Sequence, residues 1–299
     1  MKYGMPYKGS KNQIAETLIA RMPPATHFYD LFGGGGAMTH CAMLSGKFQY
    51  VHYNELDPLV FKGFQMFING DFKTENRWIS KEDFYRLRDT DPYVALCFSF
   101  GNDLKSYAYS TEREKLAKAI HYSICFNDNS LLLEYTDLKG FSYSSEDIQD
   151  RRIELQRYLK QRIENLERLG ILNTFLNDIR INSISRNLLN LKNLNSFKNK
   201  NIFLTNQSYD EVQIEEDAVI YCDPPYQNTN KYKVQFNHQE FYEWLRHSES
   251  QVFISEYEMP DDFFEVYSVK KLCSINDKGS FTVQERLYSN KPIPNTLEF

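Results

Sequence analysis

Residues 221–226 combine groups whose types and order suit work on a substrate. Asp223, Pro224, Pro225 and Tyr226 directly follow the apolar run 218–220. Proline fixes its own backbone and keeps the preceding residue extended, so the Asp223 carboxylate and the Pro224 carbonyl are expected to face one place. Two such acceptors can each take one hydrogen of an exocyclic amino group, and the Tyr226 ring offers a flat surface for stacking. The segment predicts a pocket for an amino-bearing base; the alternative is a proline-rich turn at a strand end.

A run of four glycines at 33–36 is the second chemical feature. Glycines let the backbone approach a ligand closely, and a helix opening after them points its N-terminus at that ligand. Glu55 ends the next predicted strand, where an acid can bind the ribose of an adenosine-type cofactor. The dinucleotide fingerprint G-x-G-x-x-G is absent, because Met38 and Thr39 stand where its third glycine would be. A glycine-rich turn beside a surface glutamate remains the alternative.

The charge of the chain is unevenly distributed. The formal net charge is −5, yet residues 151–200 hold eleven Lys or Arg against four acids, which is +7 there and −12 elsewhere. A basic block inside an acidic chain is typical of a contact with a phosphate backbone. Apolar residues at helical spacing, from Leu155 to Leu169, predict a helix in the same segment, so a solvated helix face is the other interpretation.

The sequence offers little support for a metal site or a membrane segment. The five cysteines are scattered with no C-x-x-C pair, and the six histidines show no ligand spacing, so we expect no metal. No stretch approaches the eighteen or so apolar residues of a membrane span, and the N-terminus has no apolar signal region. These observations predict a cytoplasmic protein of 299 residues, long enough for one large domain or a domain with an insertion.

Two parts of the chain alternate predicted strands and helices, which indicates an α/β fold. The expected elements are helix 11–21, strand 26–32, helix 37–44, strand 48–53, helix 58–68, strands 201–205 and 218–222, helix 239–246, strand 251–255, and strands near 266–271 and 281–288. Residues 95–180 show no such alternation and contain the basic helix. We interpret them as an inserted recognition region.

Three motifs, in this order along the chain, resemble the N-terminal, cofactor and catalytic motifs of the Dam-type DNA adenine-N6 methyltransferases, the D12 class with its DPPY motif. They are Tyr7-Lys8-Gly9-Ser10-Lys11, Asp30-Leu31-Phe32-Gly33-Gly34-Gly35-Gly36 and Asp223-Pro224-Pro225-Tyr226. The segments YVHYNELDP, FISEY and ERLYSN carry the resemblance to both ends of the chain. The middle is similar only loosely, and its segment LCFSFGNDLKSYAY resembles phage and prophage members.

The resemblance implies a seven-stranded, Rossmann-like, S-adenosylmethionine-dependent methyltransferase fold. The catalytic domain would comprise residues 1–94 and 181–299, with a mainly helical target-recognition region inserted at 95–180. Its implied cofactor site is Tyr7, Lys11, Asp30, Phe32, Gly33, Gly34, Gly35, Gly36, Asn54, Glu55 and Asp223. Its catalytic residues are Asp223, Pro224, Pro225 and Tyr226, and its DNA contacts are Arg151, Arg152, Arg157, Lys160, Lys231 and Lys233. At Glu55 the family more often has Asp, which weakens the match there, and Ser208 and Tyr209 match a further base contact loosely.

The implied reaction is methyl transfer to adenine N6 in double-stranded DNA. The lone pair of the amino group is conjugated with the ring, and two acceptors for its hydrogens favour a pyramidal nitrogen that can attack a methyl group, so positioning and electrostatics supply the catalysis without a metal or general base. A paired, stacked adenine cannot reach such a pocket, so the nucleotide must be flipped out of the helix. The context would be a bacterial or phage-infected cell, in restriction-modification or as an orphan or phage-protective enzyme.

Several alternatives remain beside this interpretation. Cytosine-C5 methylation needs a cysteine nucleophile usually placed after proline, whereas Cys222 precedes the aspartate, and we set it aside. A glutamine-amide methyltransferase normally has Asn at the Asp223 position. RNA adenine methylation and a catalytically inactive DNA-binding relative stay open, and an NAD-dependent enzyme is disfavoured by the missing third glycine. The sequence leaves the target DNA sequence and the oligomeric state undetermined.

Overall fold

The computed structural model describes residues 3–134, 140–166, 187, 190–192, 201–226, 236–275 and 279–293. The chain divides into two compact units. The sheet unit comprises Met1–Gly4, Ser10–Phe61 and Ser196–Phe299, and the helical unit comprises Met5–Gly9 and Lys62–Asn195. The helical unit thus begins well before residue 95, where the predicted insert starts, and its assignment to target recognition stays a prediction.

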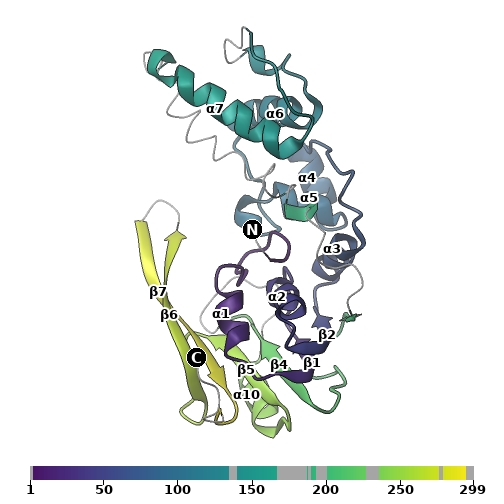
Figure 1. Cartoon of the computed structure of the whole chain (residues 1–299), viewed down its shortest axis with the longest axis vertical. Helices are drawn as coiled ribbons and strands as arrows, with labels where there is room; N and C mark the ends of the chain where they lie inside the picture. The colour runs from purple at the N-terminus through teal and green to yellow at the C-terminus, as the bar shows by residue number, and fades with distance from the viewer. Residues whose placement is uncertain are drawn as a thin grey trace. The chain divides into compact units, whose positions relative to one another are not determined.

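A seven-stranded sheet with the order β3-β2-β1-β4-β5-β7-β6 forms the centre of the sheet unit (Figure 1). Its strands are β1 (Ala25–Asp30), β2 (Phe48–Asn54), β3 (Ile202–Thr205), β4 (Ala218–Cys222), β5 (Gln251–Glu256), β6 (Phe264–Ile275) and β7 (Gly279–Ser289). Neighbouring strands from β3 to β5 are parallel, and β7 runs antiparallel to both β5 and β6. This confirms the predicted α/β class and the seven strands.

Among the described residues, the strands of the sheet unit are accompanied by the helices α1 (Ala15–Ala20), α2 (Ala37–Ser45) and α10 (His238–His247). The predicted helix 11–21 is shorter than expected at its N-terminus. Residues 11–14 form a turn, in which the Ile14 amide donates to the Lys11 carbonyl at 2.9 Å. Ile14 then serves as an N-cap without a side-chain hydrogen bond. The turn leaves the Lys11 side chain outside the regular helix.

The helical unit explains why residues 95–180 lack strand and helix alternation. The helices that the structure describes with bounds in this unit are α4 (Lys81–Leu87), α5 (Pro92–Phe98), α6 (Thr111–Phe126) and α7 (Ile148–Leu166), with short 3-10 turns at Phe100–Asn102 and Leu132–Glu134. Helix α3 (Pro58–Asn69) crosses from one unit into the other. The predicted basic helix is α7, and Leu155 of its apolar stripe is buried.

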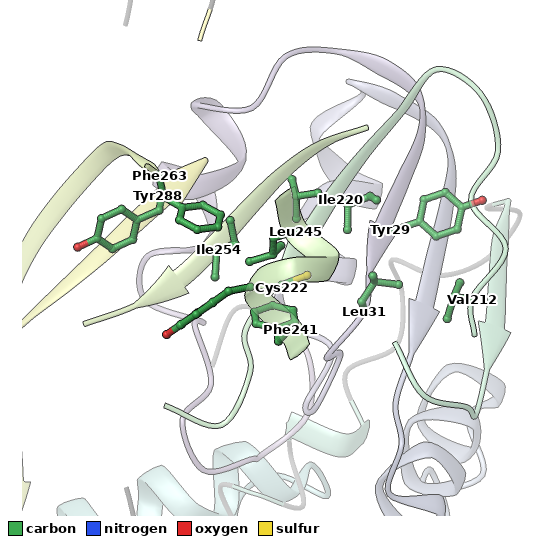
Figure 2. Packing of buried hydrophobic residues seen from close by; sticks show 12 residues of the cluster. Tyr29, Leu31, Val212, Ile220, Cys222, Phe241, Leu245, Ile254, Phe263 and Tyr288 are labelled. Atoms are coloured by element: carbon green, nitrogen blue, oxygen red, sulfur yellow. The ribbon is translucent and has the colours of Figure 1, made fainter. Parts of the chain in front are cut away.

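Apolar residues of β1, β4, β5 and α10 pack into one cluster of the sheet unit (Figure 2). Ile220 and Cys222 of β4 and Ile254 of β5 meet Phe241 and Leu245 of α10, all fully buried. Strands β4 and β5 are buried at every residue after the first, which is why they are mostly apolar in the sequence. The cluster fixes β4 at the centre of the sheet.

The strand order reverses between β1 and β4, because the chain moves from β1 to β2 and β3 on one side and continues with β4 on the other. In open α/β sheets, ligands bind at the carboxyl ends of the strands beside such a switch point. Asp30 ends β1 opposite Tyr221 of β4. The glycine run after β1 and Asp223 after β4 therefore leave the sheet at this point.

Candidate active site

The glycine turn after β1 has a shape that needs glycine. Gly34 and Gly36 have left-handed φ values of 48° and 69°, and a Cβ on Gly33 would lie 2.1 Å from the buried ring of Tyr53. The Tyr53 hydroxyl donates to the Gly34 carbonyl at 2.8 Å, and the Gly33 amide donates to the Asn54 carbonyl at 2.8 Å. Strand β2 thus holds the turn in place.

Asp30 connects the same turn to the beginning of α2. Gly36 is the N-cap of that helix and has no side chain to offer, and the Asp30 carboxylate accepts instead from the Thr39 amide at 3.1 Å and the Thr39 hydroxyl at 2.7 Å. Asp30 is 1% exposed. Burial raises its pKa to about 7, against the opposing effect of the Thr39 hydrogen bonds. The structure therefore gives Asp30 a capping role, while its predicted contact with a cofactor stays a prediction.

Glu55 and Asn54, at the end of β2, bind the backbone around the turn. The Glu55 carboxylate accepts from the amides of Gly34 at 2.8 Å and Asp57 at 2.9 Å. Burial raises its pKa, and these two hydrogen bonds oppose the rise. The Asn54 amide donates to the carbonyls of Leu31 and Gln207, both at 3.0 Å, and so ties the ends of neighbouring strands together. Both residues therefore lie beside the glycine turn, and their predicted contact with a cofactor stays a prediction.

Lys11 and Asp223 form a buried ion pair, with 2.5 Å between the Lys11 Nζ and the Asp223 Oδ2. The Lys11 side chain is 5% exposed and that of Asp223 is 20% exposed. Glu285 of β7 lies 3.2 Å from the same ammonium. Burial alone would lower the pKa of Lys11, but the carboxylates of Asp223 and Glu285 outweigh it and raise that pKa above its usual range. The lysine is therefore charged at neutral pH.

Tyr226 completes this group on the other side of the buried Pro224 and the half-buried Pro225. The Tyr226 ring meets the ring of Tyr257 edge to face, with 4.6 Å between the two centroids. The Lys11 Nζ lies 5.1 Å from the centroid of the Tyr226 ring. The Tyr226 hydroxyl donates to Glu285 at 3.3 Å. Burial and the nearby acids raise the pKa of Tyr226 well above its usual value, so the hydroxyl stays protonated.

The family comparison agrees with this geometry. A model of the D12 class N6 adenine-specific DNA methyltransferases matches residues 7–253, which is most of the chain and includes the glycine turn and the Asp223 segment. The chain belongs to this family. It is a methyltransferase that acts on adenine N6 in DNA, and the family implies a methyl donor of the S-adenosylmethionine type. No individual curated protein matched the chain.

Phe32 of the methyltransferase anchors the start of the glycine turn in an aromatic group. Its ring stacks on Tyr209 at 5.5 Å between centroids and meets Phe241 of α10 edge to face at 5.7 Å. Burial, with nearby acids, raises the pKa of Tyr209 to about 12. Phe32 therefore lies beside the turn, packed on the apolar cluster. Tyr7 belongs to the helical unit, and its cofactor contact stays a prediction.

The DNA contacts expected from the sequence fall in two groups. Arg151, Arg152, Arg157 and Lys160 lie on α7, whereas Lys231 and Lys233 lie outside the described residues. Arg157 is exposed. Arg151 donates to the Ser145 carbonyl at 3.0 Å and lies over the Tyr143 ring, so it also stabilises the approach to the helix. Whether these residues bind DNA stays a prediction.

The sequence did not single out Glu285 or Tyr257 as site residues. Both occur in segments that carried the family resemblance, ERLYSN and FISEY, but nothing in the spacing of those segments indicates a position next to Asp223. Strand order supplies this proximity. Within the described part of the chain, no group of three or more His, Cys, Asp or Glu could hold a metal ion. No helix there is long and apolar enough to cross a bilayer.

Proposed function

We propose that this methyltransferase transfers the methyl group of S-adenosylmethionine to N6 of an adenine flipped out of double-stranded DNA. The observation that carries the proposal is the Asp223 carboxylate, paired with Lys11 and still partly exposed, at the carboxyl end of the strand next to the glycine turn. An acid in that position suits an amino group brought to the switch point of the sheet.

The residues around the glycine turn fit the proposed cofactor. The left-handed glycines bring the backbone close to any ligand at the end of β1. Glu55, at the end of β2, accepts two backbone hydrogen bonds and has further acceptor capacity for ribose hydroxyls. When bound, S-adenosylmethionine supplies an electrophilic methyl carbon. The acids of this site, Asp30 and Asp223 among them, favour a positively charged ligand.

The protein groups then act by position and charge. The Asp223 carboxylate and the Pro224 carbonyl accept the two N6 hydrogens, which favours a pyramidal nitrogen with its lone pair directed at the methyl carbon. Lys11 favours the ionised form of Asp223 against the effect of burial, and the Tyr226 ring stacks on the flipped base. The Tyr257 ring, set edge to face against Tyr226, keeps the stacking surface in one orientation.

Double-stranded DNA is proposed as the substrate because the family acts on DNA and α7 presents basic residues such as Arg157; N6 would then have to leave the helix to reach Asp223. RNA with the same base is the competing substrate. The role of the methylation, in restriction-modification or in the protection of a phage genome, stays a prediction from the resemblance of the sequence.

The test uses the purified protein, labelled S-adenosylmethionine and three substrates: unmethylated double-stranded DNA, single-stranded DNA and RNA. Digestion to nucleosides identifies the methylated base, and single-molecule sequencing maps it. We expect N6-methyladenine at one recurring motif in double-stranded DNA. Label found only in RNA would show that RNA and not DNA is the substrate. Absence of cofactor binding would support the alternative that the protein is a catalytically inactive DNA-binding relative.

Two variants test whether Asp223 is responsible for the methylation. Asp223→Ala is expected to lower methylation about a thousandfold or more, because the base loses its acceptor, while cofactor binding is largely spared because the glycine turn and Glu55 are unchanged. Asp261→Ala, at an exposed position in the loop after β5, is the matched control and should methylate like the wild type. Retained turnover in Asp223→Ala would contradict the proposed role.

A further inference from the structure

We propose that Glu285 is a positioning residue of the methyl transfer: it shares the Lys11 ammonium with Asp223, so that Lys11 does not fully neutralise Asp223, which keeps acceptor strength for the adenine amino group. The inference rests on the proposed function of Asp223. It concerns a residue beyond the end of the family match at 253.

The position of Glu285 follows from the way β7 passes the end of β5. The last pair of these strands is Glu256 with Arg286, and Glu285 pairs only with Val269 of β6. Glu285 thus lies one residue past the carboxyl end of β5, at the same edge of the sheet as Asp223. Its side chain is 6% exposed. A glutamate buried there must find charged or polar partners, since an isolated buried charge is strongly disfavoured.

Two contacts supply those partners, and both belong to the site. The Glu285 Oε1 lies 3.2 Å from the Lys11 Nζ and accepts from the Tyr226 hydroxyl at 3.3 Å. The same lysine lies 2.5 Å from Asp223. One ammonium therefore serves two carboxylates, and one carboxylate oxygen holds both the lysine and the stacking tyrosine. Arg286, the next residue, donates instead to the Tyr257 carbonyl at 2.9 Å.

This sharing matters because of where charge moves in the reaction. A bond forms between N6 and the methyl carbon, the carbon–sulfur bond breaks with its electron pair staying on sulfur, and N6 becomes cationic before its proton leaves to water. Lys11 and Asp223 alone would be a neutral pair, and the ammonium would repel the charge that develops on N6. With Glu285 the three groups carry a net −1, which favours that charge in a partly dehydrated site.

The pH dependence of Asp223 gives this idea a specific signature. Burial raises the pKa of Asp223, Lys11 and the Tyr226 hydroxyl oppose the rise, and Glu285 adds to it. Other titratable groups also face this set: Tyr221 and Cys222 of β4 and Asp30 of β1 act on Lys11 or Asp223, and the buried Glu256 of β5 acts on Tyr226. Replacing the Glu285 charge removes one cause of the raised pKa. The fall of the methylation rate at acidic pH should then begin at a lower pH than in the wild type, although the maximal rate is smaller. We call this fall the acidic limb.

The experiment compares wild type, Glu285→Gln and Glu285→Asp, with Glu265→Gln as control. Glu265 lies on the neighbouring strand β6 with a half-exposed side chain, 3.5 Å from Arg286. For each variant we would measure the single-turnover methylation rate from pH 5 to 9, cofactor affinity by calorimetry, and flipping of a 2-aminopurine placed at the target base.

We expect Glu285→Gln to lower the single-turnover rate about tenfold to a hundredfold, with its acidic limb moved to lower pH and cofactor affinity within about threefold of wild type. Glu285→Asp keeps the charge and should keep the limb of the wild type. In a Lys11→Met background, Glu285→Gln should lower the single-turnover rate by less than about twofold, because the effects of residues that act through one partner are not additive.

An unchanged pH limb in Glu285→Gln, or the same loss in both backgrounds, would overturn the inference and leave Glu285 with a packing role. If Glu285→Gln fails to fold, the comparison of Glu285→Asp with wild type decides, because a displaced limb there would contradict a role carried by charge. Failure of the proposed function is distinct, because the wild type itself would then leave DNA adenine unmethylated.

Discussion

Asp30 and Asp217 make the same pair of hydrogen bonds in opposite surroundings, which allows a direct test of what burial does to the acid at the glycine turn. Asp217 accepts from the amide and hydroxyl of Thr26 at 2.8 and 2.5 Å and is exposed. Asp30 accepts from the amide and hydroxyl of Thr39 and is buried. Replacement by Asn keeps an acceptor for both hydrogen bonds and removes the charge.

The expected effect of Asp30→Asn depends on pH. An unfolded Asp ionises near its usual value of 3.8, and the folded one near 7. Between these values the folded state binds more protons than the unfolded state, so the free energy of unfolding of the wild type falls as pH rises through the window. Each pH unit in this window is worth about 1.4 kcal/mol. From pH 5 to pH 8, Asp30→Asn should therefore gain about 3 kcal/mol relative to wild type.

Urea unfolding of wild type, Asp30→Asn and Asp217→Asn at both pH values measures these differences. The two hydrogen bonds with Thr26 lower the pKa of Asp217, so Asp217 is ionised in both states at pH 5 and above, and the difference between Asp217→Asn and wild type should stay constant. If Asp30→Asn also shows a constant difference, the Asp30 carboxyl is not destabilised by burial, and our account of the turn is wrong.

Two other predictions concern the turn and the stacking residue. Gly33→Ala should lower the free energy of unfolding by about 3 kcal/mol and weaken cofactor binding, because the new Cβ meets the Tyr53 ring. Gly46→Ala has open space around its Cβ and should lower the free energy of unfolding by only about 1 kcal/mol, because Gly46 has a left-handed backbone. Urea titration and calorimetry measure both, and equal losses would contradict the steric argument. Tyr226→Ala should weaken the binding of DNA with the base flipped out by about 1–3 kcal/mol, whereas Tyr226→Phe should keep most of that binding energy. Fluorescence of 2-aminopurine at the target base measures both variants, and an equal loss of binding in the two would exclude stacking.

The fold was predictable from the sequence where burial is uniform. Strands β4 and β5 are apolar on both faces, and their predicted bounds 218–222 and 251–255 agree with the structure to within one residue. The N-terminal end of α1 was less predictable, because residues 11–14 are of types that are compatible with a helix but form a turn. Local pattern does not determine whether Lys11 joins the helix or leaves it for an acid far along the chain.

The site was predictable in its motifs and not in its connections. Asp223 and Lys11 are 212 residues apart and meet only because β4 lies beside β1. Periodicity gives no strand order, so the approach of Glu285 from β7 had no local signal. Likewise, Asp30 precedes a glycine run in the way a cofactor ligand would, and only the structure shows that its carboxylate caps α2, since Gly36 has no side chain with which to do so.

Three acids at this edge of the sheet, Asp30, Glu55 and Asp223, have raised pKa values, and burial is the largest cause for each. Each ionised carboxylate therefore costs folding free energy that a neutral residue of the same shape would not. Lys11 offsets part of this cost for Asp223 alone. A cationic ligand would offset more of it, and the proposed donor S-adenosylmethionine would lose its positive charge when methyl transfer converts its sulfonium to a neutral thioether. The same acids would thus favour the proposed methyl donor over its product, so an excess of buried negative charge is consistent with turnover and not only with binding.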